Sequence, residues 1–234
     1  VSERMAFPIP KSFSHKIAAG VFMVYGTSYH GLVQRAKINK DDEVLVLGAA
    51  GGVGLAAVDI AKSFGARVVA AVSTKEKAEV CKNYGVDDVV IYGKEELDKE
   101  GQKAFTKELK SKSTRGGFSI IYDPIGDCFA EPALRSIGWG GTYLVVGFAA
   151  GKIPAFPTNL MLLKGCAVSG VFIGRFQQEE PKQNAQNLKE IGELLGSGKL
   201  TPFISETIPM SESVDAIERI AKRGVVGKVV FVNN

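Results

Sequence analysis

A glycine-rich segment separates the apolar run Val44–Leu47 from a helical pattern that begins near Gly51. Its residues, GAAGGVG at 48–54, contain the spacing GxGxxG with an alanine in the first position. A side chain at Gly51 or Gly52 would keep pyrophosphate away from the backbone N–H groups of the first helical turn. The helix dipole favours that anion, and no acidic residue stands in the segment to repel it. The pattern favours a dinucleotide-binding turn over a ligand-free one, and Gly54 lets the helix lie close to the strand.

Polar and basic residues follow the next apolar run, which ends at Val72. NAD-binding folds usually place an acid there, about 20 residues after the glycines, to bond the ribose 2′-hydroxyl. This chain instead has Ser73, Thr74, Lys75 and Lys77. Hydroxyl and ammonium groups suit a 2′-phosphate, which a carboxylate would repel. The pattern favours NADPH as the cofactor; the alternative is that the lysines only occupy an exposed helix start.

The composition is that of a soluble globular chain, with 45% apolar and 23% charged residues. The net charge is +4, and the densest charged stretch, 94–115, mixes both signs, which favours a solvated helix face over nucleic-acid binding. No apolar run approaches the ~20 residues of a membrane span. Cys81, Cys128 and Cys166 are widely spaced, so we expect neither a disulfide framework nor a zinc site. Reduced cysteines fit the cytoplasm or the mitochondrial matrix.

Short apolar runs alternate with helical patterns along the chain, which is typical of βαβ units. Strands are expected at 43–48, 67–72, 88–91, 118–122, 141–146 and 166–172, with a later pair at 203–208 and in the closing GKVVFV. Helices are expected near 15–37, 51–64, 75–84, 95–112, 129–137 and 183–195, and after Ser211 as an N-cap. The predicted fold class is α/β, a doubly wound parallel Rossmann sheet with helices on both faces. Whether the segment after Pro181 extends that sheet or belongs to a second domain is left open by the periodicity.

Nearly the whole chain resembles the medium-chain dehydrogenase/reductase superfamily. The resemblance rests on residues 26–77, with TSYHGL and AAGGVG, and continues through IYGKEEL, IIYDPIGD, YLVVGFAAG, VSGVFIGRF and GKVVFV. The branch that it resembles is the zinc-free quinone oxidoreductases, the zeta-crystallin-like proteins. The resemblance implies a cofactor, NADPH, and a small-molecule substrate that is a carbonyl compound or a quinone.

The same resemblance implies roles for individual residues. The pyrophosphate would lie on Ala50, Gly51, Gly52, Val53 and Gly54, the 2′-phosphate on Ser73, Thr74, Lys77 and Tyr92, and the nicotinamide on Gly147, Phe148, Ala149, Phe172, Ile173 and Gly174. The alternatives are that Tyr92 only caps a strand and that Phe148 and Phe172 are core aromatics. Asp123 ends a strand but could equally be a turn residue, and no catalytic residue is assigned.

The resemblance also implies what this chain lacks. In zinc-dependent relatives a metal ligand comes from the segment around Met23–Val24, which carries no Cys, His, Asp or Glu here, so no metal is expected. His30 has no partner ligands at metal-binding spacing and is expected to pack within a helix. The family's N-terminal substrate domain is absent from the sequence, which begins without methionine. We therefore expect a remnant or linker of that domain at 1–20, an NADP-binding Rossmann domain at 21–180, and a segment that would complete the substrate domain at 181–234.

These patterns lead to a principal hypothesis and two alternatives. The principal hypothesis is an NADPH-dependent, zinc-free oxidoreductase that transfers hydride to a quinone or an α,β-unsaturated carbonyl. The alternatives are an enoyl-thioester reductase and an NADPH-binding structural or regulatory protein without turnover. The apolar strand CAVSGVFI is expected to form a sheet edge that pairs with a second copy in a homodimer.

Overall fold

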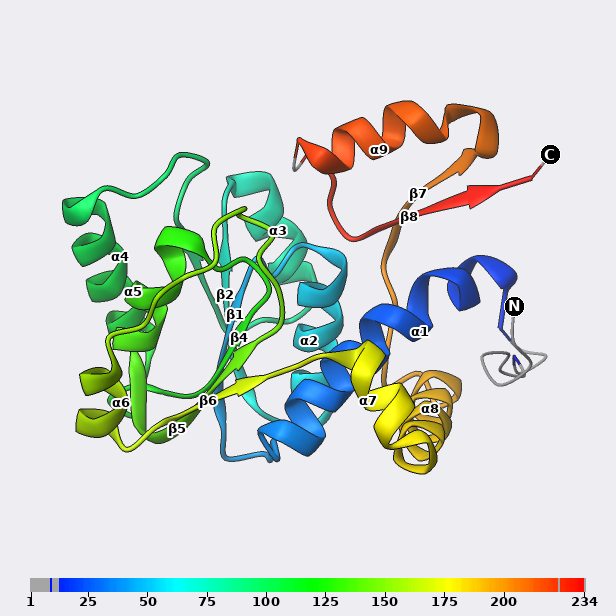
Figure 1. Ribbon diagram of the computed structural model, residues 1–234. Helices are drawn as coiled ribbons and strands as arrows, with labels where there is room; N and C mark the ends of the chain where they lie inside the picture. The colour runs from blue at the N-terminus through cyan, green and yellow to red at the C-terminus, as the bar shows by residue number, and fades with distance from the viewer. Residues whose placement is uncertain (1–8, 10–12, 223, 234) are drawn as a thin grey trace.

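The centre of the computed structural model, which describes residues 9, 13–222 and 224–233, is a six-stranded parallel sheet (Figure 1). The strand order is β3-β2-β1-β4-β5-β6. The strands are β1 (Glu43–Leu47), β2 (Arg67–Val72), β3 (Asp88–Ile91), β4 (Phe118–Asp123), β5 (Ile137–Val145) and β6 (Ala167–Gly170). Since all five pairings are parallel, the carboxyl ends of all six strands meet at one edge. The expected doubly wound α/β fold is confirmed.

Helices cover both faces of this sheet (Figure 1). One face carries α1 (His15–Tyr29), α2 (Gly52–Ser63) and α3 (Lys75–Asn83), and the other carries α4 (Lys99–Lys112), α5 (Ala130–Arg135) and α6 (Thr158–Lys164). Alternate residues of β1 divide between the two cores: Val44 and Val46 face the first set of helices, whereas Leu45 and Leu47 face the second. All of β1 is buried, so after Glu43 its sequence is a continuous apolar run instead of an alternating one.

A smaller unit follows the sheet in the chain. It consists of α7 (Ile173–Glu179), α8 (Pro181–Gly196), β7 (Ile204–Pro209), α9 (Ser213–Ala221) and β8 (Lys228–Val232). Strands β7 and β8 form a separate parallel pair, so this segment does not extend the main sheet. Helix α8 packs on α1, and its Ile191 is buried in the first core. Helix α1 itself runs through position 20, and the division at 1–20, 21–180 and 181–234 stays a prediction.

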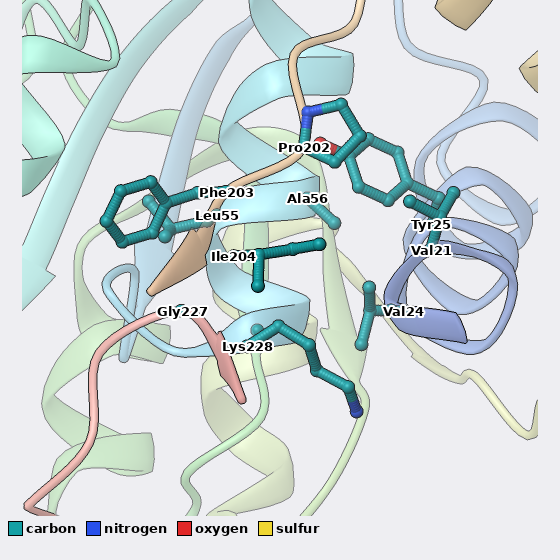
Figure 2. A pocket seen from close by; sticks show the side chains of 12 residues that line it. Val21, Val24, Tyr25, Leu55, Ala56, Pro202, Phe203, Ile204, Gly227 and Lys228 are labelled. Atoms are coloured by element: carbon teal, nitrogen blue, oxygen red, sulfur yellow. The ribbon is translucent and has the colours of Figure 1, made fainter. Parts of the chain in front are cut away.

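The start of β7 rests on the side chains of α1 and α2, as Figure 2 shows. Val21, Val24 and Leu55 meet Ile204 around a gap of about 10 Å³, which is close to the space of one water probe. In the same region the Asp59 carboxylate accepts hydrogen bonds from the Tyr25 hydroxyl and the Thr201 N–H, both at 2.7 Å. These contacts hold the start of β7 against α1 and α2.

Several predicted boundaries were wrong. Strand β5 begins at Ile137 instead of 141. The backbone of Gly138 lies directly against that of Gly117, which leaves no room for a side chain at either position. The glycines that allow this contact are also typical of a turn, so the start of the strand was missed. Strand β6 ends at Gly170, and Phe172 lies outside it, immediately before α7. The helix expected from 95 begins at Lys99 after an Asp98 cap. The long helix expected to 37 changes to a π-helix at 30–35.

The sequence patterns also failed on short helices. Ser211 is not an N-cap, because it lies within a 3₁₀ turn at Met210–Glu212 that leads directly into α9. Helix α6 was not predicted, since it leaves Leu162 and Leu163 exposed and so has no amphipathic signal. Only two residues separate helix α7 from the end of β6, and no element was predicted between 172 and 183.

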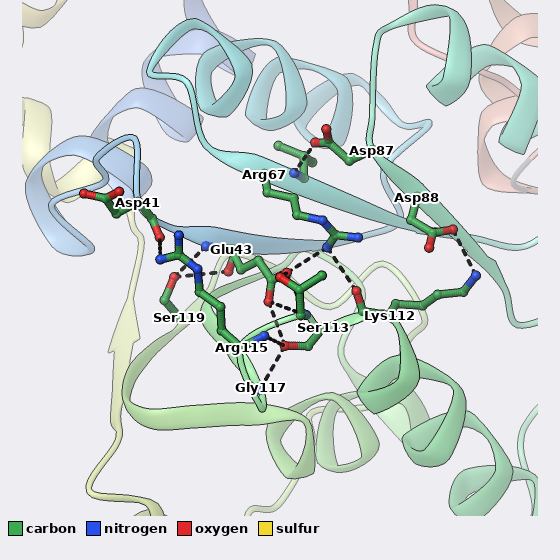
Figure 3. A network of polar contacts seen from close by, with 12 residues as sticks. Asp41, Glu43, Arg67, Asp87, Asp88, Lys112, Ser113, Arg115, Gly117 and Ser119 are labelled. Atoms are coloured by element: carbon green, nitrogen blue, oxygen red, sulfur yellow. Dashed lines mark hydrogen bonds and ion pairs between the residues drawn. The ribbon is translucent and has the colours of Figure 1, made fainter.

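A polar network closes the amino edge of the sheet, shown in Figure 3. The Glu43 carboxylate, buried at 2% exposure, accepts hydrogen bonds from the Ser113 and Thr114 hydroxyls at 2.7 Å and from Arg67 at 2.9 Å. Burial raises the pKa of Glu43, but these donors outweigh it and hold that pKa below its ordinary value. Both oxygens of the Glu43 carboxylate accept hydrogen bonds from neighbouring residues of the fold. We therefore infer that the amino edge contributes to stability and that a ligand binds at the carboxyl edge.

Candidate cofactor site

A hollow of about 440 Å³ lies at the carboxyl edge of the sheet. Residues predicted to bind the cofactor and now found in its wall are Ala50, Gly51, Gly52, Val53, Ser73, Lys77, Tyr92 and Ala149. They come from four places in the chain: the turn after β1, the start of α3, the end of β3 and the loop after β5. Parallel pairing brings these places together, since it aligns the strand ends along one edge.

The turn after β1 leaves the start of α2 open. Gly48 has φ 56°, which reverses the chain after the strand, and Gly51 is the N-cap of α2, with no side chain capping the helix. The Leu55 N–H donates to the Gly51 carbonyl at 2.8 Å and starts the helical ladder. The N–H groups of the first turn therefore have no side-chain acceptor, the arrangement in which a helix start holds an anion.

The glycines of this turn have different structural reasons. A Cβ on Gly54 would lie 2.4 Å from the Gly48 carbonyl oxygen and 2.7 Å from Ala49 Cα, so the fold itself requires glycine there. A Cβ on Gly51 would meet only the Gly48 oxygen at 3.4 Å, an ordinary contact. Gly51 also has an extended backbone that any residue adopts. The fold would accept a side chain at Gly51, and its absence keeps the hollow open next to the helix start.

The charged side chains among the described lining residues of the hollow are all positive. Lys77, Lys94 and Lys222 line it, and among the lining residues that the structure describes there is no aspartate or glutamate. Ser73 adds a hydroxyl to the same wall. A site with ammonium groups, a hydroxyl and an uncapped helix start fits a ligand that carries several phosphates, as NADPH does.

Two of the predicted 2′-phosphate residues have structural partners. Thr74 is the N-cap of α3, where its hydroxyl accepts a hydrogen bond from the Lys77 N–H at 3.3 Å, and it does not line the hollow. Tyr92 does line the hollow, with its ring 4.6 Å from Phe129 and 5.8 Å from Phe105, centroid to centroid. Tyr92 therefore presents a ring that is held by aromatic neighbours.

Most of the predicted nicotinamide residues lie beyond the hollow. Gly147 and Phe148 follow the end of β5, whereas Phe172, Ile173 and Gly174 follow β6 and begin α7; of the whole set only Ala149 lines the hollow. Phe148 is 40% exposed and Phe172 is 72% exposed, so neither is a core aromatic. Their exposure at the carboxyl edge leaves them accessible to a ligand that extends past the hollow.

The structure also adds lining residues that the motif did not indicate. Lys222, Gly224 and Val225 come from the segment between α9 and β8, and the Gly227 N–H donates to the Ala50 carbonyl at 2.8 Å. No local signal marks this segment as part of the site, because only the return of the chain brings it there. Lys94 also lines the hollow, two residues after Tyr92, where the sequence could have indicated it.

Asp123 and His30 both have structural roles. The Asp123 carboxylate accepts bonds from the Tyr143 hydroxyl at 2.6 Å and from the backbone N–H groups of the turn that follows it, and burial raises its pKa. His30 stacks on Phe176 with 3.9 Å between centroids, which confirms it as a packing histidine. Within the described residues, no three His, Cys, Asp or Glu side chains gather as metal ligands would, and the zinc-free chemistry stays a prediction.

Comparison with known proteins bears on this arrangement. The family model described as zinc-binding dehydrogenase matches residues 52–190, which is more than half of the chain. The chain belongs to that family. Within it, this family member is 34% identical to the quinone oxidoreductase-like protein 2 homolog of Nematostella vectensis, over 95% of this chain and 59% of the relative. It is also 34% identical to quinone oxidoreductase-like protein 2 of Bos taurus, over 95% of this chain and 62% of that protein.

A solved structure agrees with these matches. The quinone oxidoreductase of Thermus thermophilus, studied also as its complex with NADPH, superposes with a TM-score of 0.80 and 27% identity over 96% of this chain and 69% of that one. These likenesses confirm the quinone oxidoreductase branch of the medium-chain dehydrogenase/reductase superfamily, as the motifs predicted. The chain of this zinc-binding dehydrogenase family member spans about three fifths of the length of the two curated relatives.

Proposed function

We propose that the protein is an NADPH-dependent oxidoreductase that reduces a quinone or an α,β-unsaturated carbonyl. One observation carries this proposal. The open helix start at Gly51, the Ser73 hydroxyl and the Lys77 ammonium line one hollow, and none of its described lining residues is an aspartate or a glutamate. The relatives named above are quinone oxidoreductase-like proteins, which supports the same chemistry. When bound, NADPH would supply a hydride from the C4 position of its nicotinamide.

The residues of the chain would hold and orient the reactants. The N–H groups at the start of α2 would bind the pyrophosphate, while Ser73 and Lys77 would bind the 2′-phosphate. The exposed rings of Phe148 and Phe172 would border the nicotinamide and exclude water from the face that donates hydride. We assign no proton donor.

Oxidation of NADPH by the full-length protein tests the proposal. We expect the absorbance of NADPH at 340 nm to fall with time when an ortho-quinone or a crotonyl thioester is added. Turnover of the thioester alone would identify an enoyl-thioester reductase. Tight NADPH binding without turnover of either compound would contradict the oxidoreductase and favour a structural or regulatory role.

We also propose that the protein is a homodimer that pairs through β6. This strand is confirmed as an edge of the sheet, and beside it α6 exposes Leu162 and Leu163 at 80% and 69%. An open edge next to apolar side chains is a surface that a second copy can cover. Light scattering should give the mass of a dimer, and Leu163→Lys should shift it toward the monomer.

The control for this prediction is Val214→Lys on α9, which places the same charge on a side chain that is 67% exposed but far along the chain from the edge. We expect this variant to remain dimeric. A monomeric wild type at high concentration, or equal dissociation of the two variants, would contradict pairing through β6.

Our proposal for the compartment is based on the cysteines. Cys81, Cys128 and Cys166 are all free thiols, and burial raises the pKa of each of them. We propose the cytosol or the mitochondrial matrix, where thiols stay reduced. Cell fractionation checks this, and recovery of the protein from the secretory pathway would contradict it. Among the described residues no helix has the length and apolar character needed to cross a bilayer.

A further inference from the structure

We propose that Lys94 is a second cationic ligand of the cofactor's 2′-phosphate and that it sets the preference for NADPH together with Lys77. The inference rests on the proposed function, since it concerns how the same hollow distinguishes NADPH from NADH. It begins from an observation outside the motif: Lys94 lines the hollow, although it follows the third strand and not the second.

The backbone places Lys94 beside the end of β2. Strand β3 pairs with β2 up to Ile91, and the Tyr92 N–H then donates to the Val72 carbonyl at 2.9 Å, immediately before Ser73. Gly93 has φ 83°, so the chain turns there and brings the next residue to the rim of the hollow. Lys94 therefore belongs to the same end of the hollow as Ser73.

The first turn of α3 contributes to the same wall through Lys77. Its Thr74 cap, and then the ammonium groups of Lys94 and Lys75, hold the pKa of the exposed Glu76 carboxyl below its ordinary value. The charge of Lys94 thus acts on the first turn of α3, and Lys77 of that turn lines the hollow together with Lys94. Two ammonium groups on two separate elements border this end of the hollow.

The lysine that is adjacent in sequence has a different position. Lys75 lines another groove, on the side of α3 that carries Glu79 and Lys82, and it does not line the cofactor hollow. Sequence proximity to Ser73 suggested Lys75 and Lys77 as the basic pair, whereas the fold pairs Lys77 with Lys94. Lys75 consequently provides a matched control with the same charge and a similar exposed location.

The order of the strands indicates which phosphate meets this pair. The order β3-β2-β1 places the glycine turn after β1, where the pyrophosphate would bind. The ends of β2 and β3 lie further along the same edge, so the adenosine ribose would reach them next. A 2′-phosphate carries between one and two negative charges at neutral pH, which a single ammonium would not balance. A 2′-hydroxyl carries no negative charge to attract the two ammonium groups, so the pair discriminates against NADH.

Titration of the full-length protein with NADPH and NADH, followed by cofactor fluorescence, tests the inference. We expect Lys94→Gln to weaken NADPH binding about tenfold, in the range of a lost charge-assisted hydrogen bond. NADH affinity should change less than about twofold, because its 2′-hydroxyl makes no ion pair. Lys75→Gln should alter neither affinity, and Lys94→Arg should retain most of the NADPH affinity.

Each outcome distinguishes the inference from the proposed function. An unchanged NADPH affinity in Lys94→Gln, with a wild type that prefers NADPH, would overturn the role of Lys94 and leave the proposed function intact. Equal losses in Lys94→Gln and Lys75→Gln would also overturn it, because general surface charge would then explain both. A wild type that binds neither dinucleotide would refute the proposed function, and the role of Lys94 with it. Thermal melting of each variant verifies that it is folded.

Discussion

Replacing Gly54 with alanine is expected to lower the free energy of unfolding by about 3 kcal/mol, the upper end for one extra methyl group in a tight core. The added Cβ would lie 2.4 Å from the Gly48 carbonyl oxygen and 2.8 Å from the Ala49 carbonyl carbon. Both obstacles are backbone atoms, which cannot rotate away as a side chain would. Helix α2 would have to move off the turn, so the variant should also lose cofactor affinity.

Urea unfolding followed by circular dichroism measures this effect, with Gly192→Ala as the control. Gly192 is also a helical glycine, in α8, but a Cβ there would meet nothing within 4 Å. The control should keep or gain stability, by up to about 1 kcal/mol, because alanine restricts the unfolded chain. A Gly54→Ala protein as stable as wild type would mean that the helix does not lie this close to the turn.

Reversing the charge of Lys77 is expected to abolish the preference for NADPH. In Lys77→Glu a carboxylate would replace an ammonium in the wall of the hollow, next to Ser73. Loss of one charge-assisted contact costs about 1.5–3 kcal/mol, and repulsion of the phosphate adds to it, so NADPH affinity should fall roughly 100-fold. NADH should bind as well as before or better, since a carboxylate can accept a bond from the ribose 2′-hydroxyl.

Lys82→Glu provides the control for this prediction. Lys82 lies in the last turn of the same helix, pairs with Glu79 at 2.8 Å and lines the groove on the other side of α3. It changes the net charge equally, and we expect it to leave the ratio of NADPH to NADH affinity unchanged. Equal wild-type affinities for the two dinucleotides, or an unchanged ratio in Lys77→Glu, would refute the assignment of the 2′-phosphate.

Local sequence determined the elements that carry the glycine motif. The limits of β2 were predicted without error, and those of β1, α2 and α3 to within one residue, because each is a buried run or an amphipathic pattern bounded by glycine or a capping side chain. The elements that were missed are α6 and α7 and the early start of β5, where exposed leucines or glycines hide the pattern. In those places contacts between distant segments override local propensity.

The sequence by itself indicated the kind of ligand. The features that did so are a glycine-rich turn at 48–54 and a strand end that carries hydroxyl and basic side chains. Only the tertiary structure decided which residues share the wall. It left Lys75 outside the wall and added Lys94. It also added the segment at 224–227, which reaches the turn through the hydrogen bond from Gly227 to Ala50. The physical reason is that parallel strands align their carboxyl ends whatever their separation in the chain, whereas the direction of a side chain depends on the helix that carries it.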